Sequence, residues 1–177
     1  MTEPAIRVHE LEKSYGQVRA VKGISFEVGR GEVFGLLGPN GAGKTTTVEI
    51  LEGYRSRSGG EVSVLGHDPE RAGIDLKRQI GIVLQSSGFY PYATVRESVA
   101  HMAAFYPHPR DTRETIALVG LDGKEDQRAG QLSGGQRRRL DLALALVGDP
   151  ELIFLDEPTT GFDQAARLTA WDAIRNL

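Results

Sequence analysis

The fold of this chain is decided by one stretch, Gly38-Pro39-Asn40-Gly41-Ala42-Gly43-Lys44-Thr45-Thr46. It matches the pattern G-x-x-x-x-G-K-[ST], in which glycines let backbone N–H groups curl around phosphates. The apolar run Val33–Leu37 precedes it, and a helical pattern from Thr45 to Glu52 follows and ends near Gly53. Because the predicted order is strand, glycine loop and helix, we interpret the stretch as a phosphate-binding loop rather than a glycine turn with a surface lysine.

Three side chains of this loop have predicted roles. Lys44 is expected to reach the β- and γ-phosphates of a nucleotide, and Thr45 to place its hydroxyl on Mg²⁺. Thr46 is expected near the α-phosphate. The sequence therefore predicts a nucleotide site whose phosphate contacts come from residues 38–46.

Composition limits the remaining possibilities. The chain has 177 residues, of which 40% are hydrophobic and 25% charged, and this is typical of one folded domain. The net charge of -3 argues against a general nucleic-acid-binding surface. No cysteine is present, which fits a reducing compartment, and no apolar run reaches the roughly 18 residues of a membrane span. Any role at a membrane is therefore expected to require a partner.

Short apolar runs alternate with helical patterns, which predicts an α/β fold with a mainly parallel sheet. An antiparallel layer is expected from Ile6–Val8, Ile24–Val28 and Val62–Leu65, and buried strands from Ile80–Leu84 and Leu152–Leu155. Thr94 and Glu97 form a predicted capping box, and Leu140–Val147 a buried helix that Gly148 ends. We expect an α/β core from residues 1–86 and 147–177, with 87–146 as an inserted helical subdomain.

Two carboxylates, Asp156 and Glu157, follow the predicted strand Leu152–Leu155. At the carboxyl end of a parallel strand, Asp156 would hold Mg²⁺ and Glu157 would act as general base on a water molecule. The alternative is an acidic pair at the start of the next helix.

The stretch Leu132-Ser133-Gly134-Gly135-Gln136 is a second glycine loop before a predicted helix. In isolation it is also compatible with a glycine turn that carries a serine cap. Together with the loop at 38–46 and Asp156-Glu157, in this order, it resembles the signature of ABC transporter nucleotide-binding subunits. The resemblance covers essentially the whole chain and implies a P-loop NTPase fold that binds ATP and Mg²⁺.

The resemblance also implies roles for single residues. Tyr15 would stack on adenine, with a half-buried strand or turn tyrosine as the alternative. Gln85 would contact Mg²⁺ and water, or else is a polar strand end. Asp163 lies in the dimer-contact loop, where Phe162 replaces the more usual leucine. The residues Ser133, Gly134, Gly135 and Gln136 would contact the ATP of a second head, and the predicted catalytic residues are Glu157, Gln85 and Lys44.

Other charged residues are interpreted as structural. We prefer a solvated helix start for Arg137–Arg139 over an anion-binding patch. His9, His67, His101 and His108 show no spacing typical of metal ligands.

The chain is expected to be the ATP-hydrolysing subunit of a membrane transporter, working as a homo- or heterodimer with a multi-span membrane subunit. It would lie in the cytoplasm on the inner face of the membrane, and residues 53–69 and 84–97 loosely resemble exporters. The apolar stripe from Leu168 to Leu177 has no strand after it. We therefore expect a C-terminal truncation that lacks the family's switch histidine, and impaired hydrolysis.

Two other classes of nucleotide-binding protein are alternatives. A soluble ABC protein of translation or DNA repair is expected to carry paired heads or long coiled-coil insertions. A P-loop kinase does not account for the loop Leu132–Gln136.

Overall fold

The computed structural model describes residues 3–83 and 90–155, and the chain divides into two compact units, Met1–Lys77 and Arg78–Leu177. The strands are β1 (Ile6–Tyr15), β2 (Val18–Val28), β3 (Gly59–Val64), β4 (Ile80–Val83) and β5 (Leu152–Leu155). The helices are α1 (Lys44–Leu51), α2 (Ile74–Lys77), α3 (Val95–Ala103), α4 (Thr112–Leu118) and α5 (Gly134–Leu146), with a 3₁₀ turn at Ala129–Gln131.

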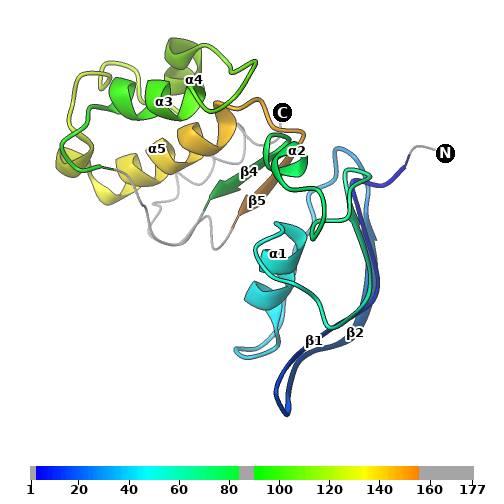
Figure 1. Cartoon of the computed structure of the whole chain (residues 1–177). Coiled ribbons are helices and arrows are strands. Elements are labelled where there is room, and N and C mark those ends of the chain that lie inside the picture. Colours follow the sequence, from blue (N-terminus) through cyan, green and yellow to red (C-terminus); the bar gives the residue numbers. More distant parts are fainter. Residues whose placement is uncertain (1–2, 84–89, 156–177) are drawn as a thin grey trace. The chain divides into compact units, whose positions relative to one another are not determined.

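The first unit is built on an antiparallel sheet with the strand order β2-β1-β3. Ile6 pairs with Val28 on one side and with Val64 on the other, and all three side chains are buried. Figure 1 shows β1 and β2 as a long curved hairpin, and α1 packs against the sheet. The predicted antiparallel layer is confirmed, with longer strands than the apolar runs alone indicate.

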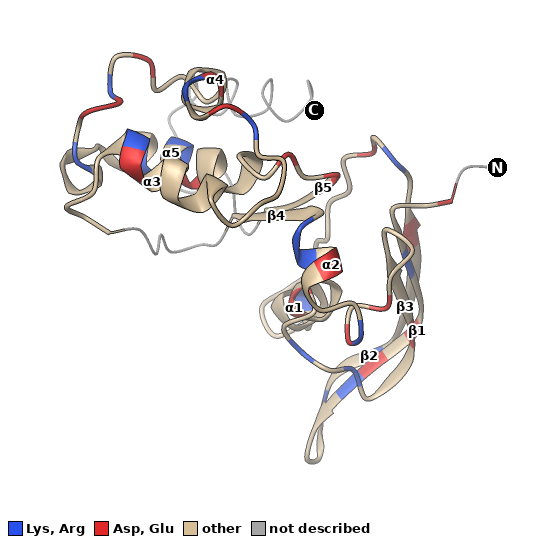
Figure 2. Ribbon diagram, turned by 45° about the horizontal axis from the view of Figure 1, so that its top comes forward, with Lys and Arg blue, Asp and Glu red and all other residues tan. Residues whose placement is uncertain are grey.

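Charges on this sheet are arranged in pairs of opposite sign. Arg7 contacts Glu27 at 2.7 Å and Arg19 contacts Glu12 at 2.8 Å, with all four side chains largely exposed. Figure 2 shows the corresponding basic and acidic stretches interspersed along the strands. Exposed pairs of this kind contribute little to stability, so the sheet is held mainly by its buried apolar face.

The segment Val33–Leu37 differs from the sequence prediction because it forms no strand. Val33 is 61% exposed and Leu37 is 92% exposed. Phe34 stacks on Phe26 of β2 with ring centroids 5.1 Å apart. An apolar run becomes a strand only beside a free strand edge, and no described strand pairs with this segment.

The second unit contains the parallel pair β4–β5, in which Ile80 pairs with Leu152 and Val83 with Leu155. Helices α3, α4 and α5 pack together, and α5 packs on β4 (Figure 1). The buried core is formed mainly by Val95 and Val99 of α3, Ile116 of α4, and Leu140 and Leu146 of α5. Parallel pairing of β4 with β5 confirms the α/β class.

The predicted threonine cap is present in this unit. Thr94 Oγ1 accepts the Glu97 backbone N–H at 3.1 Å, while Glu97 Oε2 accepts the Thr94 N–H at 2.8 Å. The second bond lowers the pKa of Glu97 because it favours the ionised carboxylate. The capping box predicted at the start of α3 is therefore confirmed.

The C-terminal end of α5 differs in detail from the prediction. Gly148 does not take the left-handed conformation expected of a C-cap glycine; Asp149 does, at φ 54. A Cβ atom on Gly148 would collide with the ring of Tyr106. Glycine is needed here for space rather than for its backbone freedom.

Candidate functional site

The glycine loop at 38–46 follows β2 and continues into the first turn of α1, and its backbone is constrained. Gly41 and Gly43 have φ angles of 80° and 86°, which side chains with a Cβ rarely adopt. A Cβ on Gly43 would also collide with the backbone carbonyl oxygen of Ala20 in β2. The close approach of loop and strand therefore fixes glycine at this position.

Lys44 turns back over its own loop. Its Nζ donates to the carbonyl oxygens of Gly38 at 2.7 Å and Pro39 at 3.0 Å. The Ala42 N–H donates to Pro39 O at 3.2 Å and closes the turn. The loop thus presents a cation and the N-terminal end of a helix within a few residues of each other.

The N-terminus of α1 is not capped by a side chain. Gly43 is the N-cap residue and no side-chain hydrogen bond is made there. Thr47 is buried and donates its hydroxyl to Gly43 O at 2.9 Å, which satisfies a carbonyl and leaves the first-turn N–H groups unaffected. Helix N-termini with free N–H groups bind anions through those donors and the helix dipole.

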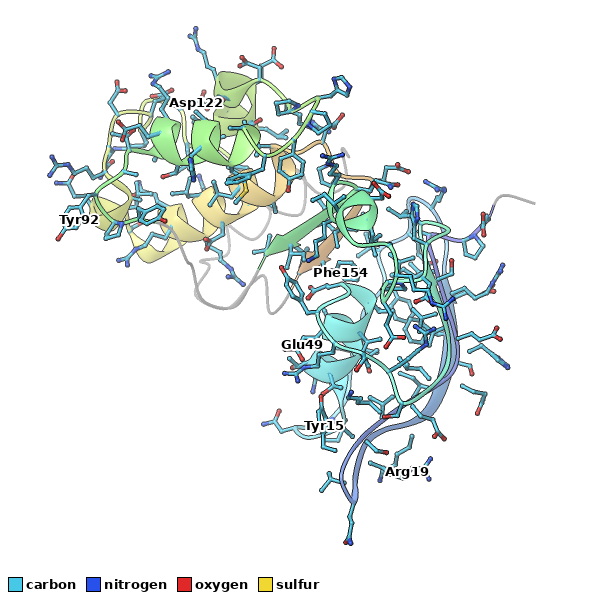
Figure 3. All side chains as sticks on the ribbon, viewed as in Figure 1. Tyr15, Arg19, Glu49, Tyr92, Asp122 and Phe154 are labelled. Atoms are coloured by element: carbon cyan, nitrogen blue, oxygen red, sulfur yellow. The ribbon has the colours of Figure 1, made fainter. Side chains whose placement is uncertain are left out.

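Tyr15 ends β1 and is 43% exposed. Lys13 Nζ lies 5.2 Å and Arg55 Cζ 5.8 Å from the centre of its ring. Arg55 in turn contacts Glu49 of α1. Figure 3 labels Tyr15 and Glu49 near each other in the first unit. The structure thus connects the predicted base-stacking residue to the helix that follows the phosphate loop.

The second glycine loop begins α5. Ser133 Oγ accepts the Gln136 backbone N–H at 3.2 Å, and Gln136 Oε1 accepts the Ser133 N–H at 2.9 Å. Ser133 and Gly134 are exposed, while Gly135 and Gln136 are half-buried. Leu132 is buried and anchors the loop in the core of the second unit. The loop therefore forms a rigid helix start with an accessible backbone.

The sequence pattern of the ABC transporter family matches residues 21–160, which include both glycine loops. The chain belongs to the ABC transporter family. Its curated relatives include two proteins named "Nod factor export ATP-binding protein I". The protein of Paraburkholderia xenovorans is 40% identical over 184 residues, covering 100% of this chain and 60% of the relative. That of Rhizobium meliloti is 42% identical, with 98% of this chain and 53% of the relative covered.

Solved structures of ABC proteins have the same fold as this ABC chain. The cbiO1 protein from Clostridium perfringens, described as part of the ABC transporter complex cbiONQ, has a TM-score of 0.86 at 30% identity. The comparison covers 99% of this chain and 74% of cbiO1. An ATP-binding subunit of an ABC transporter also gives 0.86 at 23% identity, covering 97% of this chain and 74% of that one. The predicted P-loop NTPase fold is confirmed, whereas the chain spans only about 60% of the length of its first curated relatives.

Several predicted site residues of this ABC chain lie outside the described ranges. These are Gln85, Asp156, Glu157 and Asp163. The strand β5 ends at Leu155, directly before the two predicted carboxylates. Their roles stay predictions from the sequence.

The interpretation of Arg137–Arg139 as a solvated helix start is wrong for the middle residue. Arg138 is only 8% exposed and its Nη1 lies 3.9 Å from Asp141 Oδ2, one turn further along α5. Arg137 and Arg139 donate to the backbone carbonyls of Leu132 and Gly120. The i,i+3 spacing of Arg138 and Asp141 could have indicated this pair, but it does not indicate burial.

Within residues 3–83 and 90–155, no cluster of three or more acidic or histidine side chains is arranged to hold a metal ion. Over the same ranges, none of the helices combines the length and apolar character that crossing a bilayer requires.

Proposed function

We propose that this chain binds Mg-ATP and hydrolyses it as the energy-coupling subunit of a membrane ABC transporter, of exporter type. The observation that carries the proposal is the phosphate loop at 38–46. Its lysine, its left-handed glycines and the uncapped start of α1 all lie at one point of the first unit. The family membership and the names of the relatives support the same function.

The chemistry of this loop suits a triphosphate. Lys44 Nζ now contacts two carbonyl oxygens, and we propose that it exchanges them for oxygens of the β- and γ-phosphates. A charged lysine–phosphate hydrogen bond is roughly twice as strong as a neutral one, which favours that exchange. The first-turn N–H groups of α1 would donate to the same phosphates.

The proposed ligands of Mg²⁺ all carry side-chain oxygen atoms, the donors that this ion prefers. Thr45 is the second residue of α1 and is exposed, so its hydroxyl oxygen can serve as a ligand. With Gln85 and Asp156 it would supply the oxygen ligands that Mg²⁺ requires. Bound there, the ion would neutralise charge on the phosphates. Glu157 would orient the attacking water and accept its proton.

The partners follow from the two separate glycine loops. We propose that Ser133–Gln136 contacts the ATP of a second head, since one nucleotide does not require two such loops of the same chain. The dimer would lie in the cytoplasm on the inner face of a membrane, bound to a multi-span subunit. The names of the curated relatives support export as the direction of transport.

The experiment compares ATP affinity of the chain and of Lys44→Ala by calorimetry in Mg²⁺. We expect Lys44→Ala to weaken binding by at least about tenfold, because a charged contact contributes about 1.5–3 kcal/mol. Lys22→Ala, an exposed lysine on β2, is the matched control and is expected to bind normally. Equal affinity of Lys44→Ala and the unchanged chain would refute the proposed site.

The transport role has a test of its own. A gene for a multi-span membrane protein beside the gene for this chain would support it. A second ATPase head encoded in the same full-length chain, with no such neighbour, would favour the soluble class of ABC proteins instead.

A further inference from the structure

The ring of Tyr15 lies beside two charged side chains of the first unit. Lys13 comes from β1 itself, whereas Arg55 comes from the segment after α1. Both cations lie within about 6 Å of the ring centre, the range in which cations are attracted to aromatic rings. The orientation of this exposed ring is therefore restrained rather than free.

Arg55 is itself fixed by Glu49 of α1. Its Nε contacts Glu49 Oε2, and its Nη2 lies 3.3 Å from Glu49 Oε1, so both carboxylate oxygens are used. The pKa of Arg55 is raised by this hydrogen bond, then by the charge of Glu49, and further by Tyr15. A two-point contact fixes the plane of a guanidinium more firmly than a single bond does.

Hydrogen bonds connect the backbone around Arg55 to α1 on one side and to β1 on the other. The Arg55 and Tyr54 N–H groups donate to Glu49 O at 3.1 and 2.8 Å. Ser58 binds the end of β1 twice, since its N–H donates to Glu12 O at 2.8 Å and its Oγ accepts the Ser14 N–H at 3.0 Å. The segment 54–58 is thus bonded both to α1 and to the strand that carries Tyr15.

We propose that Arg55, held by Glu49, is a positioning residue for the nucleotide base. Through this pair, the Tyr15 ring is set at a fixed distance and tilt from α1, the helix whose first residue is Lys44. The inference rests on the proposed binding of ATP, with the base on Tyr15. Its consequence is that Arg55 affects recognition of the base and leaves recognition of the phosphates unchanged.

The test uses two probes with the whole chain, Mg-ATP and Mg²⁺ with inorganic triphosphate, which lacks the base. We expect Arg55→Met to weaken ATP binding by about fivefold, part of what base stacking contributes, and to leave triphosphate affinity within about twofold. Glu49→Gln is expected to act in the same direction but less, because Arg55 then keeps its position only in part. Arg55→Lys keeps the charge and is expected to restore part of the ATP affinity.

The control is Arg7→Met, which removes an arginine of similar exposure from an ion pair with Glu27 in the same unit. It is expected to change neither affinity. Normal ATP binding by Arg55→Met, or an equal loss for both probes, would overturn the inference, since an equal loss indicates only a structural role. If the unchanged chain binds neither probe, the proposed function fails as well, and this outcome is distinguishable from the other two.

Discussion

The ion pair between Arg57 and Asp68 allows a quantitative prediction about acid stability. Arg57 Nη1 and Nη2 donate to the two carboxylate oxygens of Asp68, both at 2.8 Å, and the Glu70 N–H donates to Asp68 Oδ1 at 3.1 Å. The hydrogen bond from Arg57 is the largest cause that lowers the pKa of Asp68, from 3.8 to about 2. Because Asp68 is 27% exposed, most of this shift is retained as stability.

The direction of the pKa shift decides at which pH this contribution to stability is lost. The folded-state pKa of Asp68 is below its unfolded value, so the contribution is fully present above the unfolded pKa of 3.8 and is lost as the pH falls through about 2. A shift of this size corresponds to about 2 kcal/mol of unfolding free energy at pH 7, and about half of it remains at pH 3.

The assay is urea unfolding of the chain and of Asp68→Asn at pH 7 and at pH 3. We expect the difference in unfolding free energy to be about 2 kcal/mol at pH 7 and about 1 kcal/mol at pH 3. In an Arg57→Met background, Asp68→Asn should show much less of this pH dependence. If the difference between the chain and Asp68→Asn is the same at both pH values, the reasoning is refuted.

Three further substitutions test the caps and the helix end of the second unit. Ser133→Ala and Thr94→Ala each remove one capping box and are expected to lower the unfolding free energy by about 1 kcal/mol, measured by urea unfolding. ATP turnover of the dimer should fall only with Ser133→Ala, and equal turnover in both variants would contradict the role proposed for Ser133. Gly148→Ala forces a Cβ into the Tyr106 ring and is expected to cost about 1–3 kcal/mol. A thermal midpoint unchanged by Gly148→Ala would show that Tyr106 moves aside freely.

Local sequence signals predicted much of the fold. The capping box at Thr94 was predicted because its partners are three residues apart and their bonds depend only on helix geometry. The box at Ser133 has the same spacing, but a serine cap was considered there only as an alternative. The loop at 38–46 was predictable because its pattern is also local, with glycines, Lys44 and Thr45 at a fixed spacing. The strand expected at Val33–Leu37 was not found, because pairing depends on which distant strand edge is available, and an apolar run does not specify that.

The candidate site was predicted only in part. Arg55 was missed, because its place beside Tyr15 depends on the bonds of Ser58 to β1 and of Glu49 to the backbone after α1. Contacts between residues 40 positions apart leave no periodic pattern in one sequence. The burial of Arg138 was missed likewise, since three consecutive arginines are usually solvated.

The uncapped start of α1 has a consequence for the stability of the chain when no nucleotide is bound. The N-cap residues of α3, α4 and α5 are Thr94, Asp111 and Ser133, and the side chain of each accepts a backbone N–H of its helix. The N-cap residue of α1 is Gly43, which has no such acceptor. Under the proposed function, a phosphate completes that helix. Because a ligand that binds only the folded state stabilises it by mass action, nucleotide would then raise the free energy of unfolding of this chain. The thermal midpoint of the chain would therefore depend on the nucleotide concentration, and the dependence would reflect the affinity of the phosphate loop.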